Sequence, residues 1–210
     1  MAMLRSRGIN TILDVGANEG QFAQMLRDEG YDGRIISFEP LSSAWEKLKA
    51  NAKNDPLWEV APRGAIGSVE GEIEFHIAGN SASSSALNML EACSDAAPES
   101  AFVGAERVPV HRLDSLAPAY LREDSALLIK IDTQGYEAEV LSGAQLTLKR
   151  TTGLHLELSL VPLYQGQALY SQIIGMVQQE GFELWGFTPG FADPRTGRLL
   201  QGDGIFFRAG

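Results

Sequence analysis

The stretch Ile12-Leu13-Asp14-Val15-Gly16-Ala17-Asn18-Glu19-Gly20 decides the fold of this chain, together with Ile35-Ile36-Ser37-Phe38-Glu39-Pro40. An apolar strand runs into a glycine-rich turn, a helix follows, and a second strand ends on the carboxylate of Glu39. Glycines let a ligand approach the backbone closely, and a helix N-terminus offers unpaired N–H groups to an anionic end. An acid after the second strand can accept hydrogen bonds from ribose hydroxyls. This order of elements is typical of an open parallel sheet that holds a nucleoside.

The spacing of the glycines indicates which nucleoside is bound. A dinucleotide fold has the pattern G-x-G-x-x-G over a pyrophosphate, whereas this turn reads Asp14-x-Gly16-x-Asn18-x-Gly20. It resembles the first motif of S-adenosylmethionine-dependent methyltransferases, whose cofactor has no pyrophosphate. We therefore expect Asp14, Gly16, Asn18 and Gly20 to bind the cofactor, with Asp14 holding the loop N–H groups or helping to bind the methionyl ammonium. The alternative is a tight strand-to-helix turn without a ligand.

Composition limits the class of protein and of partner. The 210 residues, 44% hydrophobic with a mean hydropathy of -0.08, predict one globular domain over residues 1–210. No apolar run reaches the roughly 20 residues of a membrane span, and the single Cys93 cannot form an internal disulfide, so we expect a cytoplasmic protein. The net charge of -10 without a Lys/Arg cluster argues against nucleic acid and favours neutral hydroxylated acceptors.

Alternating strand and helix patterns predict a Rossmann-like α/β fold: a mostly parallel seven-stranded sheet with helices on both faces. The last two strands are close enough in sequence to pair as a terminal antiparallel hairpin. Residues 71–77 are expected to form a hairpin extension, and Asp114 to cap a short helix that ends near residue 120. The predicted strands are residues 11–15, 34–38, 58–66, 126–131, 153–160, 182–187 and 205–208; the predicted helices are residues 19–29, 42–51, 135–148 and 168–180.

The second half contains an unusually specific motif, Lys130-Ile131-Asp132-x-x-Gly135-x-Glu137-x-x-Val140-Leu141-x-Gly143-Ala144. With the two stretches quoted above, it resembles the FkbM family of S-adenosylmethionine-dependent methyltransferases over residues 11–208. The resemblance implies the class I methyltransferase fold and a cofactor that leaves as S-adenosyl-L-homocysteine. It also implies a hydroxyl acceptor on a sugar, glycolipid, polysaccharide or macrolide.

One position departs from many class I methyltransferases, which end the third strand with an acid that binds the adenine amino group. Here that region reads Arg63-Gly64-Ala65-Ile66-Gly67. We therefore expect adenine to meet backbone atoms and apolar contacts, with Leu41, Ala65 and Ile66 as cofactor-binding residues.

Three residues are candidates for catalysis: Asp132, His155 and Glu157. Asp132 ends a central strand, where it either faces the methionine end of the cofactor or the substrate hydroxyl, or caps the helix that begins near Gly135. Lys130 shares a face with Asp132 and is expected to pair with it or with Glu137, or to be solvated. His155 and Glu157 alternate with leucines, which places them on one face of a strand, and polar groups there must be paired or line a cavity.

The proposed reaction needs a base for the acceptor hydroxyl, and the sequence leaves the choice among these three residues open. Histidine suits this task near neutral pH, while a carboxylate needs a raised pKa. Asp132 and Glu157 could also converge on a divalent metal, but two acids do not define a site, so no obligate metal is predicted.

Two other functions remain open at this stage: a non-catalytic module that binds S-adenosylmethionine, and an NAD-dependent oxidoreductase, which the glycine spacing and the final hairpin disfavour. The Ser-rich segment 79–86 is either a surface loop or a flap near the site. The sequence leaves the oligomeric state open and points to a small-molecule or glycan hydroxyl acceptor.

Overall fold

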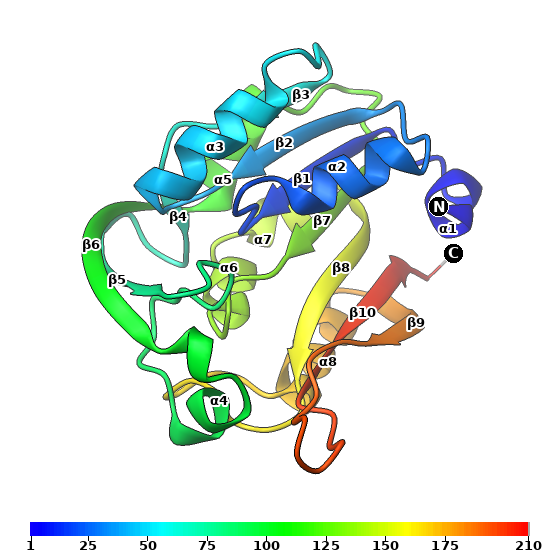
Figure 1. Cartoon of the computed structure of the whole chain (residues 1–210). Helices are drawn as coiled ribbons and strands as arrows, with labels where there is room; N and C mark the ends of the chain where they lie inside the picture. The colour runs from blue at the N-terminus through cyan, green and yellow to red at the C-terminus, as the bar shows by residue number, and fades with distance from the viewer. Residues whose placement is uncertain (210) are drawn as a thin grey trace.

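The computed structural model describes residues 1–209 and contains a seven-stranded mixed sheet (Figure 1). Its strands are β1 (Thr11–Val15), β2 (Arg34–Phe38), β3 (Trp58–Val60), β7 (Leu127–Ile131), β8 (Thr151–Ser159), β9 (Phe182–Pro189) and β10 (Gln201–Arg208). They lie in the order β3-β2-β1-β7-β8-β10-β9. The first five strands of this order, from β3 through β2, β1 and β7 to β8, are parallel, and β10 is antiparallel to both of its neighbours. The predicted sheet with its terminal antiparallel hairpin is confirmed.

Helices cover both faces of this sheet, as predicted. Strands β1 and β7 are buried along their whole length, which explains their nearly continuous apolar sequences. On one face, Ile12, Ile35 and Leu128 pack against α2 (Gln21–Asp28) and α3 (Ser42–Ala52), with α1 (Ala2–Ser6) at the margin. The opposite face packs against α5 (Leu113–Leu116), α6 (Glu137–Ser142), α7 (Gln145–Leu148) and α8 (Tyr170–Gln179).

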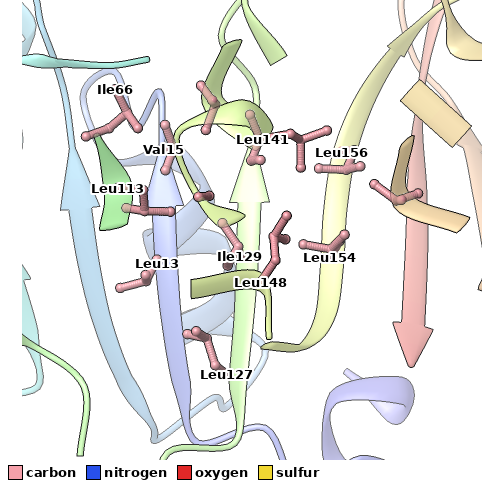
Figure 2. Packing of buried hydrophobic residues seen from close by; sticks show 14 of the residues in the cluster. Leu13, Val15, Ile66, Leu113, Leu127, Ile129, Leu141, Leu148, Leu154 and Leu156 are labelled. Carbon is pink, nitrogen blue, oxygen red and sulfur yellow. The ribbon is translucent and has the colours of Figure 1, made fainter. Parts of the chain in front are cut away.

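The larger part of the core lies on this second face. Figure 2 shows leucine, isoleucine and valine side chains from three adjacent strands meeting those of α6 and α7. The labelled strand residues there are Leu13, Val15, Leu127, Ile129, Leu154 and Leu156, and the helix residues are Leu141 and Leu148. The face is therefore closed by aliphatic packing.

The predicted single strand over residues 58–66 is wrong, because the chain leaves the large sheet after Val60. Pro62 has no N–H to continue a ladder, and the N–H of Ala61 makes the last bond to Ser37 O, at 3.0 Å. Residues Ala65–Ile66 form β4 in a second sheet, with β5 (Gly71–Ala78) and β6 (Phe102–His111) in the order β4-β6-β5. The predicted hairpin extension is therefore present as β5 and β6, and α4 (Glu91–Ala96) follows the loop after β5.

The predicted helix over residues 135–148 is divided into α6 and α7 at Gly143. A Cβ atom on Gly143 would overlap the carbonyl oxygen of Gly67, so the loop after β4 packs directly on the helix backbone here. The side chain of Asp114 holds the N-terminus of the second helix, α7, because its Oδ1 accepts from Leu146 N at 3.0 Å and from Thr147 N at 2.8 Å. Asp114 thus caps α7, whereas the sequence had suggested that it caps the helix that follows it.

This close approach predicts opposite effects for two glycine substitutions. Gly143→Ala should destabilise the protein by about 1–3 kcal/mol, because the added methyl group overpacks the contact with Gly67. Gly175→Ala, in the middle of α8 with open space around it, should stabilise the protein by about 0.5–1 kcal/mol. Urea unfolding midpoints measure both changes. Equal effects of the two substitutions would contradict the packing described at Gly143.

Candidate functional site

A cavity of about 450 Å³ opens at the carboxyl ends of β1, β2 and β7, where the strand order reverses between β1 and β7. Open α/β sheets bind ligands at such a switch point, and ligand pockets measure about 300–1,000 Å³. The wall is formed by the turn after β1, the end of β2, β4, part of the segment 81–84, and the loop after β7. His155 from β8 and Asp203 from β10 complete it.

The turn after β1 has an unusual backbone. Gly16, Asn18 and Gly20 have φ angles of 76°, 48° and 96°, a region that favours glycine and tolerates asparagine. A Cβ atom on Gly16 would overlap the carbonyl oxygen of Asp132, so only glycine allows β1 and β7 to end so close together. Gly16 and Asn18 line the cavity, while Gly20 lies behind it, where a Cβ atom would meet the ring of Trp58.

Glu39 joins the two turns at the ends of β1 and β2. Its carboxylate accepts hydrogen bonds from Asn18 N at 2.8 Å and from Leu41 N at 2.9 Å. The side chain lines the cavity, yet only 4% of the residue is exposed. Burial raises the pKa of Glu39 from its ordinary value of 4.5 to about 7, although the two N–H donors and Lys130 act in the opposite direction.

Asp14 lies beneath the cavity and not in its wall. Its Oδ2 accepts from Ser37 Oγ at 3.2 Å, and that hydroxyl in turn accepts from the indole N–H of Trp58 at 3.0 Å. Its Oδ1 lies 3.1 Å from the Nζ of Lys130. Within residues 1–209, no N–H of the glycine turn donates to Asp14, so the structure gives it a different partner from the loop contact expected from the sequence.

Lys130 is a buried cation at the centre of the site. Its Nζ donates to the carbonyl oxygen of Gly16 at 2.9 Å and lies 3.7 Å from Asp132 Oδ2. Burial lowers the pKa of Lys130, but the charges of Asp14 and Asp132 outweigh it, so the pKa is raised and the amine stays charged. The expected pairing with Asp132 is present at this longer distance, and the stronger partner is Asp14.

The loop after β7 is held by a single acid from α6. Oε1 of Glu137 accepts from Thr133 N, Thr133 Oγ1 and Gly135 N at 2.9, 3.0 and 3.1 Å. Glu137 thus holds the loop before α6, and this helix has no side-chain cap, so the capping role that the sequence had offered as an alternative for Asp132 is not found. This leaves the carboxylate of Asp132 in the cavity wall, close to Lys130.

Gln134 connects the two candidate acids, although the sequence analysis did not single it out. Its Nε2 donates to Asp132 Oδ1 and to Glu157 Oε2, both at 2.9 Å, and its Oε1 accepts from the hydroxyl of Tyr164 at 3.0 Å. Glu157 lies behind Gln134 and not in the cavity wall. Burial, together with the charge of Asp132, raises the pKa of Glu157 well above its ordinary value.

His155 lies in the wall with a partner that sequence reasoning missed. Its Nε2 is 3.5 Å from Oδ1 of Asp203, and its ring meets Phe22 edge-on at 5.3 Å between centroids. Asp203 lies before the strand that the sequence predicts over residues 205–208, but β10 begins at Gln201 and its register with β8 places Asp203 opposite Glu157. The signal in the sequence was the placement of Gln201, Asp203 and Ile205 at every second residue, and it becomes readable only once the pairing of these strands is known.

The opposite end of the cavity is apolar. Leu41, Ala65 and Ile66 are buried and line it together with Phe75, as the sequence suggested for this end of the site. Ser81, Ala82 and Ser84 close the wall, so the Ser-rich segment belongs to the cavity and is more than a surface loop. Ser85 Oγ anchors it by donating to the carbonyl oxygen of Gln134 at 2.7 Å.

Two features are absent from residues 1–209. No group of three or more His, Cys, Asp or Glu side chains in this part of the chain is arranged to hold a metal ion. None of the helices described there combines the length and apolar character needed to cross a membrane.

Comparison with known proteins agrees with this geometry. Residues 14–184 match the model of the methyltransferase FkbM domain. The chain belongs to the FkbM methyltransferase family. It is 28% identical over 182 residues to the 2-O-methyltransferase NoeI of Sinorhizobium fredii, a match that covers 82% of this chain and 72% of NoeI. S-adenosyl-L-methionine is the methyl donor of the family, so the predicted family and cofactor class are confirmed.

Solved structures show the same fold at low sequence identity. Fibrillarin of Aeropyrum pernix, in complex with natively bound S-adenosyl-L-methionine, has a TM-score of 0.51 and 11% identity over 94% of this chain and 66% of its own. Sp1610 of Streptococcus pneumoniae, also in complex with S-adenosyl-L-methionine, has a TM-score of 0.53 and 11% identity over 100% of this chain and 73% of its own. The predicted class I methyltransferase fold is therefore confirmed.

The buried acids of the site predict an unusual dependence of stability on pH. Between pH 4.5 and about 7, folded Glu39 keeps a proton that the unfolded chain has lost, so the free energy of unfolding should fall as pH rises through this window. The full contribution is roughly 3 kcal/mol. Urea unfolding at pH 5 and pH 7.5 measures it, with Glu39→Gln showing a smaller fall than the unaltered protein. Glu46→Gln, an exposed position on α3, is the matched control and should keep the full fall. The same fall in all three proteins would contradict the burial of a titrating Glu39.

Proposed function

We propose that this chain transfers the methyl group of S-adenosyl-L-methionine to a hydroxyl oxygen of a sugar, glycolipid, polysaccharide or macrolide acceptor. The observation that carries the proposal is the cavity at the switch point, with Glu39 in its wall between an apolar end and a polar end. Support for an oxygen acceptor comes from the 2-O-methyltransferase activity named for the relative NoeI.

The residues of the cavity fit the chemistry of this donor. The apolar end, with Leu41, Ala65 and Ile66, suits an adenine ring. Glu39 offers carboxylate oxygens to ribose hydroxyls, and the turn at Gly16 and Asn18 leads to the N-terminus of α2, which favours a carboxylate. In this assignment Asp132 holds the methionyl ammonium at the polar end. The cavity volume of about 450 Å³ lies in the range expected for a ligand of this size.

When bound, S-adenosyl-L-methionine would supply a methyl group bonded to a sulfonium sulfur. An acceptor oxygen can attack the carbon of this group in line with the C–S bond. The contribution of the chain is first to align the reacting atoms, which can remove about 7–11 kcal/mol of the barrier. A base that accepts the hydroxyl proton adds roughly 10²–10⁴-fold. Asp132 and His155 lie in the wall at this end, with Glu157 behind Gln134.

The charges of the site support a neutral acceptor over nucleic acid. Among the described residues of the wall, Lys130 is the one lysine and there is no arginine. The charge of Lys130 is already paired with Asp14. A phosphate backbone would therefore meet acids without a free cation at this end, in a chain whose net charge is -10. Hydroxyl groups, in contrast, can donate to the carboxylates of Asp132 and Asp203 in the wall.

The role of Glu39 can be tested by isothermal titration with S-adenosyl-L-methionine. Glu39→Ala should weaken binding about 10–100-fold, because hydrogen bonds to a charged acceptor contribute about 1.5–3 kcal/mol. Glu46→Ala on the exposed side of α3 is the control and should bind as the unaltered protein does. Thermal melting establishes that the variant is folded. Equal affinities for the two variants would contradict the assignment of Glu39.

The acceptor class can be tested by mass spectrometry. The protein is incubated with S-adenosyl-L-methionine and a panel of methyl glycosides, glycolipid headgroups, macrolide alcohols and a short RNA. We expect a gain of one methyl group on a hydroxylated neutral compound and none on the RNA. Methylation of the RNA alone would overturn the proposed acceptor, and binding of the donor without any transfer would indicate a non-catalytic module.

A further inference from the structure

His155 and Asp203 form a pair in the wall at the polar end of the cavity. The two residues lie on adjacent antiparallel strands, β8 and β10, with Nε2 of His155 3.5 Å from Oδ1 of Asp203. The edge-on contact with Phe22 holds the imidazole from the other side. We propose that His155 is the general base for the acceptor hydroxyl and that Asp203 is the residue that positions its ring. This inference rests on the proposed methyl transfer and identifies the residues that move its proton.

The other two candidate bases are already engaged. Asp132 Oδ1 accepts from Gln134, and its Oδ2 faces the ammonium of Lys130 at 3.7 Å. Glu157 is outside the wall and accepts from the same Gln134 amide. Burial and the charge of Asp132 raise the pKa of Glu157, and Gln134 separates its carboxyl group from the cavity. His155 is the candidate that combines a place in the wall with a free ring nitrogen.

The surroundings of His155 determine which ring nitrogen is free. Asp203 faces Nε2 from β10, Lys130 is the register neighbour on β7, Glu157 lies two residues along β8, and Phe22 packs from α2. A carboxylate opposite Nε2 favours the tautomer with the hydrogen on Nε2. Nδ1 has no hydrogen-bond partner among residues 1–209 and is left with its lone pair.

The step balances with these groups alone. The acceptor oxygen forms the new C–O bond as the C–S bond breaks, and the electron pair of the broken bond goes to sulfur. The hydroxyl proton goes to Nδ1 of His155. The products are the methyl ether, S-adenosyl-L-homocysteine and an imidazolium whose Nε2–H faces the carboxylate of Asp203. That carboxylate stabilises the charge as it forms and keeps the ring from turning.

Steady-state kinetics test the pair, with the substrate being the glycoside of the panel that accepts a methyl group. His155→Gln should lower kcat roughly 10²–10⁴-fold while the Kd for S-adenosyl-L-methionine changes less than about twofold. Asp203→Asn should lower kcat about 10–100-fold with little change in KM, and Asp203→Glu should recover part of the loss. Glu183→Gln, an exposed carboxylate on β9, is the control and should be unaffected. Imidazole in the buffer should restore part of the activity of His155→Ala but not that of Asp132→Ala.

A second readout needs neither donor nor acceptor. Long-range ¹H–¹⁵N correlation spectra of the free protein should show neutral His155 with its hydrogen on Nε2, and Asp203→Asn should shift the population toward Nδ1–H. An Nδ1–H tautomer in the unaltered protein, or unchanged kcat in His155→Gln, overturns the proposal. Failure of the unaltered protein to bind S-adenosyl-L-methionine or to methylate any glycoside instead overturns the proposed function, while the tautomer still decides whether Asp203 positions His155.

Discussion

The buried ammonium of Lys130 is the interaction on which the rest of the site depends. Removing such a charge from water costs several kcal/mol, which partners must offset. Adjacent parallel strands supply them, because the register places Asp14 of β1 directly beside Lys130 of β7. A second contact, to the carbonyl oxygen of Gly16, fixes the turn that must also lie against the backbone of Asp132. A well-packed apolar pair could match the stability of an ion pair. What an apolar pair could not supply is the hydrogen bond to Gly16 and the charge beside Asp132.

Around this cation, acids of the same type have different surroundings and so different tasks. Glu137 accepts from groups of its own loop and lies outside the cavity wall, whereas Glu39 accepts one N–H from each of two turns and still lines the cavity. Asp132 stays near the cation with part of its surface open to the cavity. Glu157 is set behind Gln134, where burial and the charge of Asp132 raise its pKa, and its side chain does not reach the cavity wall. The set of acidic groups that lines the cavity is thus smaller than the number of acids around it, because Asp14, Glu137 and Glu157 lie outside the wall.

Local patterns predicted most of the sheet, because strands buried on both faces and the glycine turn leave strong marks in sequence. The errors came where distant segments meet. The strand over residues 58–66 divides because the second sheet captures its end, and the helix over residues 135–148 divides because Gly67 lies against Gly143. The same limit applies to the site. Asp203 is assigned to it by the pairing of β10 with β8, a contact across more than forty residues of chain that no local motif contains.

The Ser-rich segment shows how such distant contacts shape the choice of acceptor. Its hydroxyl groups could have been donors for a polar substrate, but Ser81 bonds to Asn18, Ser84 to the N–H of Ala78, and Ser85 to the carbonyl of Gln134. The segment therefore forms a fixed wall whose polar groups are largely used within the protein. If the acceptor is hydroxylated as proposed, its recognition falls to the groups with bonding capacity left at the polar end, which are Asp132 after β7, His155 of β8 and Asp203 of β10. On that proposal, selectivity is a property of the strand ends, and the loop limits shape and access.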